Sequence, residues 1–225
     1  MISDWSTIWL SLRLAFISMA ILLIIATPLA WWLSQTHSRL KPLVLSIITL
    51  PIVLPPTVLG FYLLLLLSPD GAIGVITESL GFGSLVFTFW GLVVGSIIYS
   101  LPFAVQPIYN AFSSIDKGVL ELGATMGASP FTRFKSIALP LAKTGILSAA
   151  ILSFAHTLGE FGVILMIGGN IPEETRVLSI AIYDHVEALN FEQAHTLSLG
   201  LVIFAFCVVW CLAYLQQNSK ERRST

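Results

Sequence analysis

The sequence predicts an all-α protein: a polytopic membrane bundle of five transmembrane helices with a two-helix hairpin on one side, in a single domain over residues 1–225. The chain is 56% hydrophobic and 10% charged, with a mean hydropathy of +0.90, and a soluble core does not bury that much apolar surface. Five apolar segments are each long enough to cross a hydrocarbon layer about 30 Å thick. They lie near residues 8–33, 43–67, 85–109, 141–167 and 194–215.

The first segment, near 8–33, has tryptophans at both ends, which is typical of the two interfaces of a membrane. Trp5 and Trp9 lie at its start, and Trp31 and Trp32 lie at its end. No basic region precedes it, and its apolar run is longer than that of a signal peptide. We therefore expect it to remain in the protein as a membrane anchor.

The second segment is interrupted by prolines in the run LPIVLPPTVLGFYLLLL, at Pro51, Pro55 and Pro56. Proline removes a backbone donor, so the freed carbonyls need neighbouring groups or a water-lined cavity. Interrupted helices often line a translocation route, and a simple kink at a helix contact is an equally good interpretation. In the third segment, Pro102 and Pro107 predict a kink near the inner end.

A polar hairpin at 113–140 separates the third and fourth segments, and a simple membrane anchor has no use for it. Gly127 suits the left-handed conformation that closes a helix, Ser129 can cap the next helix, and Pro130 suits its first turn. A third helix is expected to begin at the Leu139–Pro140 step. The pattern predicts two short helices joined by a tight corner.

The fourth segment carries polar groups at membrane depth. A charge at Glu160 is costly there, which makes this residue a functional candidate. His156 precedes it by four residues, so the two side chains share a helix face and either form a hydrogen-bonded pair or serve a function. Ser153, His156 and Thr157 offer hydrogen-bond donors to a passing anion, whereas Glu160 repels anions and suits a gate or scaffold.

The segment from 168 to 193 follows, and its stretch Thr175–Ala188 has the pattern of a weak amphipathic helix. This helix is expected either to lie on the membrane surface or to tuck back into a dimer.

Charged residues set the orientation, because Lys and Arg in short loops favour the cytoplasmic side. With five spans, the N-terminus is expected outside, and the C-terminus and the hairpin in the cytoplasm. The basic residues assigned to the cytoplasmic side are Arg39, Lys41, Lys117, Arg133, Lys135, Lys143, Lys220, Arg222 and Arg223. The outer side carries Asp4, Asp70, Glu78, Glu173, Glu174, Asp184, Glu187 and Glu192 against Arg176.

Several function classes are disfavoured by the same sequence. The net charge of −1 and the dispersed basic residues give no nucleic-acid binding surface. A metal site needs more ligands than His156 and Glu160. No hydrolase or nucleotide-binding motif is present, so we expect this chain to bind no cofactor and not to be an enzyme.

The hairpin resembles the cytoplasmic loop of bacterial ABC importer permeases, whose pattern is E-A-A, three residues, G, nine residues, I-x-L-P. Five positions match this pattern, and Leu122 and Gly123 stand in place of its two alanines. The resemblance assigns contact with an ATPase subunit to Glu121, Leu122, Gly123, Gly127, Ile137, Leu139 and Pro140.

Nearly the whole chain resembles the molybdate permeases of this group, through LPIVLPPTVLGFYLLL (50–65) and HTLGEFGVILMIGGNIPEETRVL (156–178). The resemblance implies import of molybdate or tungstate across a bacterial inner membrane by alternating access. It also implies a homodimer in the lipid bilayer, two ATPase subunits that hold ATP and Mg²⁺, and an extracytoplasmic oxyanion-binding protein. The expected path or gate residues are Pro55, Pro56, Ser153, His156, Thr157, Glu160 and Asn170.

Two alternatives remain open at this stage. Sulfate or thiosulfate permeases share the E-F-G or E-Y-G element and the hairpin, although the stretch from Asn170 to Arg176 looks more like the molybdate branch. The second alternative is a metal-dependent membrane enzyme that uses His156 and Glu160, although an enzyme has no need for the hairpin.

Overall fold

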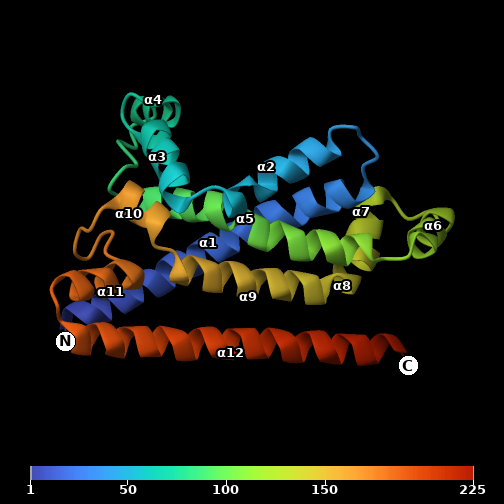
Figure 1. Ribbon diagram of the computed structural model, residues 1–225. Helices are drawn as coiled ribbons and strands as arrows, with labels where there is room; N and C mark the ends of the chain where they lie inside the picture. Colours follow the sequence, from blue (N-terminus) through green and yellow to red (C-terminus); the bar gives the residue numbers. More distant parts are fainter. Residues whose placement is uncertain (1, 225) are drawn as a thin grey trace.

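The computed structural model describes the backbone of residues 2–224 and the side chains of residues 5–214, and every regular element in that range is helical. The elements, drawn in Figure 1, are α1 (Ile2–Gln35), α2 (Lys41–Val53), α3 (Pro56–Leu67), α4 (Ala72–Ser79), α5 (Phe89–Ser113), α6 (Lys117–Thr125), α7 (Pro130–Arg133), the π-helical turn η1 (Phe134–Ala138), α8 (Leu139–Leu141), α9 (Lys143–Gly159), α10 (Gly162–Gly168), α11 (Leu178–Glu187) and α12 (Phe191–Ser224).

Four helical stretches in the described chain are long and apolar enough to cross a membrane, and a bent pair of helices makes a fifth if it counts as one span. The polytopic helical bundle is thus confirmed. The four stretches are Trp5–Gln35, Pro56–Ser79, Phe89–Ser113 and Phe191–Tyr214, and the bent pair is Pro130–Leu141 with Lys143–Gly159.

The second predicted segment, 43–67, is interrupted at its prolines as expected, but its two halves do not form one span with those bounds. α2 ends at Val53, and the apolar stretch long enough to span begins at Pro56 and continues to Ser79. Leu54 and Pro55 between them are extended, with ψ of 138° and 134°. The reason is local: each precedes a proline, whose ring clashes with a helical residue before it. α2, with 13 residues, is too short to cross a membrane alone.

The centre of the bundle is formed by α1, α5 and α9, which pack against one another. Leu22 and Ala26 of α1 are fully buried against Val105 and Ile108 of α5 in the largest apolar cluster. α12 runs along the outside of this bundle (Figure 1), and only 6% of its spanning window is buried within the chain. Its apolar surface therefore suits contact with lipid.

The segment after α10 folds back over the outer end of its own bundle. α11 realises the predicted amphipathic helix, and it packs against α12 and α1. The N–H of Leu178 donates to Ser11 Oγ of α1 at 2.7 Å, and the N–H of Phe89 donates to Glu174 Oε1 at 3.2 Å. These bonds tie the segment to α1 and to the start of α5, so it does not stand apart from the bundle as a surface helix.

Candidate coupling hairpin and translocation path

The hairpin has the shape that its glycine and serine predict. Gly127 follows α6 with a φ of +83°, a left-handed conformation that glycine adopts without a Cβ clash. Ser129 Oγ accepts the N–H of Thr132 and caps α7. Asp116 caps α6 in the same way through Gly118, a cap that the sequence reasoning missed although Asp is a preferred N-cap residue.

The tip of the hairpin exposes large apolar side chains on its surface. Leu122 is 65% exposed, Met126 86% and Phe131 69%, and Glu121 beside them is exposed too. Exposed apolar groups of this size at a membrane protein's polar end are typical of a protein contact. Leu122, which replaces an alanine of the family pattern, therefore enlarges the outward apolar surface.

Gly123 faces inward, where α6 packs on the second arm of the hairpin. A Cβ built on Gly123 lies 2.7 Å from Ile137 Cδ1 and 3.5 Å from Arg133 Cγ. The glycine thus leaves room for the Ile137 side chain and has a packing role inside the hairpin. Of the remaining predicted coupling residues, Leu139 is half-buried and Pro140 is exposed.

The expectation that a new helix begins at Leu139–Pro140 is wrong. Pro130–Leu141 forms one helical stretch, and the chain bends by 69° after it, where Ala142 leads into α9. The π-helical turn η1 precedes the proline, and in it the N–H of Leu139 reaches Phe134 O. Such a wide turn accommodates the missing donor of Pro140, so the helix continues past it.

The fourth predicted segment, 141–167, is broken near its outer end. α9 ends at Gly159, Glu160 is extended with φ −71° and ψ 131°, and α10 begins at Gly162. A Cβ built on Gly162 lies 2.8 Å from Pro56 Cβ, so the glycine permits the start of α10 to meet the start of α3. The two interrupted segments therefore meet at their breaks, Pro55–Pro56 on one side and Glu160–Phe161 on the other.

The hydrogen-bonded pair of His156 and Glu160, one of the two alternatives that the sequence offers, does not form. Because the helix ends at Gly159, Glu160 leaves the helix face of His156. Among the described residues, neither Glu160 carboxylate oxygen has a hydrogen-bond partner, and the buried Ser96 Oγ has none either. The backbone oxygen of Glu160 accepts from Ser179 Oγ of α11 at 2.5 Å. A buried carboxylate without a partner is costly, which keeps Glu160 a functional candidate.

His156 instead belongs to a cluster between α9 and α5. Its Nδ1 lies 2.8 Å from Ser100 Oγ, which is also 3.1 Å from Thr157 Oγ1. The imidazole stacks on Phe103 with ring centroids 4.0 Å apart and contacts Tyr99 at 4.8 Å. Three hydroxyl and imidazole groups at membrane depth thus satisfy one another and fix the contact of the two helices.

The other predicted path residues lie in different parts of the structure. Ser153 is buried, and its hydroxyl donates to Ala149 O of its own helix at 2.7 Å. Asn170 is exposed and donates to both carboxylate oxygens of Asp184, at 2.8 and 2.7 Å, while Arg176 pairs with Asp184 at 3.0 Å. Asn170 therefore fastens the outer segment, and it does not join the cluster around His156.

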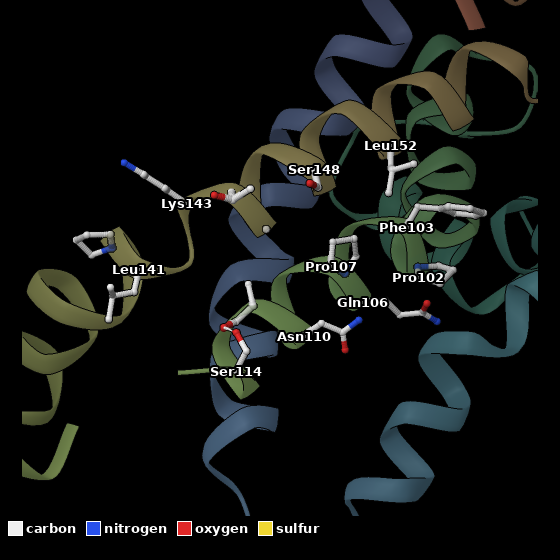
Figure 2. Close-up of a pocket in the computed structure, with 14 residues that line it drawn as sticks. Pro102, Phe103, Gln106, Pro107, Asn110, Ser114, Leu141, Lys143, Ser148 and Leu152 are labelled. Atoms are coloured by element: carbon white, nitrogen blue, oxygen red, sulfur yellow. Dashed lines mark hydrogen bonds between the residues drawn. The ribbon is translucent and has the colours of Figure 1, made fainter. Parts of the chain in front are cut away.

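A cavity of about 730 Å³ lies between α5 and the start of α9, and sequence reasoning did not identify it. Gln106 and Asn110 of α5 extend into its open space, and Ser148 of α9 lies on its other side (Figure 2). The two amides are four residues apart and share a helix face. Polar side chains with that spacing in an apolar segment are the signal in the sequence that identifies them.

Within the described residues, no group of three or more His, Cys, Asp or Glu side chains lies close enough to hold a metal ion.

The fold and sequence resemble known transport proteins. The molybdenum transport system permease protein of Azotobacter vinelandii is 54% identical over 209 residues, which cover 93% of this chain and 92% of that protein. A bacterial alginate ABC transporter was solved in complex with a periplasmic protein that holds an alginate pentasaccharide. It superposes on this chain with a TM-score of 0.75 and 18% sequence identity, and the match covers 95% of this chain and 78% of the transporter chain. The MetNI methionine ABC transporter, in an inward-facing conformation, superposes with a TM-score of 0.70 and 19% sequence identity, and the match covers 94% of each chain.

The model of the family described as "binding-protein-dependent transport system inner membrane component" matches residues 24–223. This match decides against the membrane enzyme, because the family is a transport component. A multi-pass protein of the inner membrane also agrees with the helical stretches that are long enough to span. The chain therefore belongs to the family of binding-protein-dependent transport system inner membrane components.

Proposed function

We propose that this chain is the membrane-spanning permease subunit of an ATP-driven molybdate importer. The observation that carries the proposal is the 54% identity, over almost the full length of both chains, with a protein described as a molybdenum transport permease. The exposed apolar tip of the hairpin and the two helix breaks that meet in the bundle support the same function. Tungstate, an oxyanion of the same shape and charge, is included in the proposed substrate class.

The proposed assembly contains two copies of this chain, two ATPase subunits and an extracytoplasmic binding protein. One copy encloses little space by itself, so the path is assigned to the twofold interface between two copies. ATP and Mg²⁺ belong to the ATPase subunits, because this chain has no nucleotide-binding motif. The Leu122, Met126 and Phe131 surface is the proposed contact with one ATPase subunit.

The proposed orientation has the N-terminus outside and the C-terminus in the cytoplasm. In Figure 1 the hairpin elements α6 and α7 lie at the same end of the bundle as the C-terminus, whereas α10, α11 and the N-terminus lie at the other end. Lys117, Arg133 and Lys135 are in the hairpin, so the basic end is the cytoplasmic one under the positive-inside rule.

The proposed mechanism is alternating access. Closure of the ATPase pair moves the hairpin, the stretch Pro130–Leu141 moves with it, and the bend at Ala142 passes this motion to α9. α9 carries the His156 cluster and ends at Gly159, next to Glu160, so its movement displaces the break against Pro56. Glu160 is proposed as a gate residue rather than a ligand, since a carboxylate repels an oxyanion.

Uptake of labelled molybdate by proteoliposomes tests the function, with the ATPase and binding protein added and with excess sulfate as competitor. Molybdate uptake that resists sulfate supports the proposal, and sulfate uptake that resists molybdate overturns it in favour of the sulfate permease.

Gly127→Pro tests the coupling. Proline fixes φ near −65°, far from the observed +83°, and it removes the N–H that donates to Ala124 O at 3.0 Å. We expect uptake to be lost while the protein remains in the membrane and ATP hydrolysis continues. Gly127→Asn is the matched control, because asparagine tolerates the left-handed region. Normal uptake by the proline variant refutes the coupling role.

A further inference from the structure

The cavity between α5 and α9 holds polar groups that no other part of the mechanism uses. Gln106 and Asn110 line it, and neither side-chain amide has a hydrogen-bond partner among the described residues. Thr144 adds a hydroxyl from α9, whereas Ser114 Oγ already donates to Ala111 O at 2.9 Å. Two free amides and a free hydroxyl thus face one space whose volume, about 730 Å³, is in the range of small-molecule sites.

The cavity wall carries no negative charge, and its neutral donors suit weak binding of an anion. None of the fourteen lining residues is Asp or Glu, so nothing in the wall repels an oxyanion. Lys143 is the one cation among them, and its side chain extends away from Gln106 and Asn110 (Figure 2). Neutral N–H and O–H donors satisfy the acceptor oxygens of a tetrahedral oxyanion without the strong attraction of a fixed charge.

The position of the cavity assigns it to the cytoplasmic half of the path. Pro140 and Leu141, the last residues before the 69° bend, form part of its wall, and so does Gly145 of α9. A movement of the hairpin that changes the bend therefore changes the wall of the cavity. The same step that couples ATP hydrolysis to the permease thus acts on the space where the donors lie.

We propose that Gln106 and Asn110 form a low-affinity binding site for a tetrahedral oxyanion, which holds the substrate at the cytoplasmic end of the path before release. This proposal rests on the proposed function, because the substrate class is taken from it. The site uses the side-chain N–H groups of the two amides, with their carbonyl oxygens turned away from the anion. Thr144 contributes a further donor from the facing helix.

The test measures molybdate bound at equilibrium by the complex of this chain with its ATPase subunits in nanodiscs, without nucleotide and without binding protein. Gln106→Glu and Asn110→Asp keep the shape of each side chain and add a negative charge. We expect each to weaken binding about tenfold, equivalent to ~1.4 kcal/mol. Gln193→Glu, on the exposed first turn of α12 outside the cavity, is the matched control and should leave binding unchanged.

Lys143→Gln separates the amides from the cation. Because Lys143 points away from them, we expect less than about a twofold change in binding. A loss with Lys143→Gln as large as that with the two acidic variants assigns the anion to the lysine and overturns the amide site. Equal binding by the wild type and the acidic variants, or no binding by the wild type, overturns it as well.

Uptake measured on the same preparations separates failure of this site from failure of the proposed function. ATP-dependent molybdate uptake by the wild type, together with unchanged binding in the acidic variants, overturns the release site alone. Absence of molybdate uptake by a wild type that hydrolyses ATP overturns the proposed function. Copurification of each variant with the ATPase subunits shows that it is folded.

Discussion

Gly145 allows α9 to approach α5 closely, and replacing it by alanine gives a sharp prediction. A Cβ built there lies 2.3 Å from Ala111 Cβ and 2.8 Å from Pro107 O. Carbon atoms in contact prefer about 3.5–4.0 Å, so α9 has to move away from α5 by roughly an ångström or more. Neither obstacle is the end of a flexible side chain, so neither can turn aside.

The expected cost of Gly145→Ala follows from overpacking, which typically destabilises by about 1–3 kcal/mol. The higher helix propensity of alanine offsets about 1 kcal/mol of this. Gly200→Ala in α12 is the control, because a Cβ at Gly200 meets no described atom within 4 Å while alanine still gains helix propensity there. The difference between the two variants therefore reports mainly the overpacking cost.

Thermal unfolding of the purified variants in one detergent checks this prediction. For a chain of this length, 1 kcal/mol corresponds to about 2–4 °C in Tm, so Gly145→Ala should melt several degrees below Gly200→Ala. Equal melting temperatures for the two variants refute the close approach of α5 and α9 at Gly145.

Three further predictions rest on single contacts. Ser100→Ala leaves His156 Nδ1 without its partner and should lower the free energy of unfolding by about 1–3 kcal/mol, and an unchanged Tm contradicts the cluster. Gly123→Ala should keep wild-type uptake and Tm, because the added Cβ meets only the movable Cδ1 methyl of Ile137. Loss of uptake in this variant shows that the contact between α6 and Ile137 is rigid. Tyr183 donates to Glu187, which raises the pKa of the phenol, so it should ionise at higher pH than free tyrosine. This contribution to stability is present below pH 10 and is lost as the pH rises through the raised pKa. In Glu187→Gln, ultraviolet titration should give a lower Tyr183 pKa than in the wild type, and no difference between the two contradicts the bond.

Local backbone chemistry explains what the sequence predicts well. The left-handed turn at Gly127 and the cap at Ser129 depend on a few neighbouring residues, so the pattern identifies both. The step at Leu139–Pro140 has equally local signals, but the π-helical turn before it absorbs the proline. A wide turn of this kind depends on several contacts together, and no single residue type in the sequence predicts it.

Tertiary contacts explain what the sequence does not predict. Helical periodicity pairs His156 with Glu160, yet the helix ends between them because Gly162 allows α10 to pack on Pro56 more than a hundred residues earlier in the chain. Asn170 looks like a path residue in a motif, and its partner Asp184 is visible only in the fold. Gln106 and Asn110 share a helix face in the sequence pattern, but the cavity that they line is formed only when α9 packs beside α5.

In the proposed mechanism, the 69° bend at Ala142 also fixes the direction in which a pull on the hairpin reaches α9. At this angle, a displacement along the axis of Pro130–Leu141 has a larger component across α9 than along it. In the proposed mechanism, a pull on the hairpin therefore tilts α9 more than it slides it through the bilayer. Tilting leaves almost the same apolar residues in the hydrocarbon, whereas sliding carries polar helix ends into it. In this proposed mechanism, the corner lets the proposed ATPase subunits do mechanical work on a buried helix at little cost in lipid solvation.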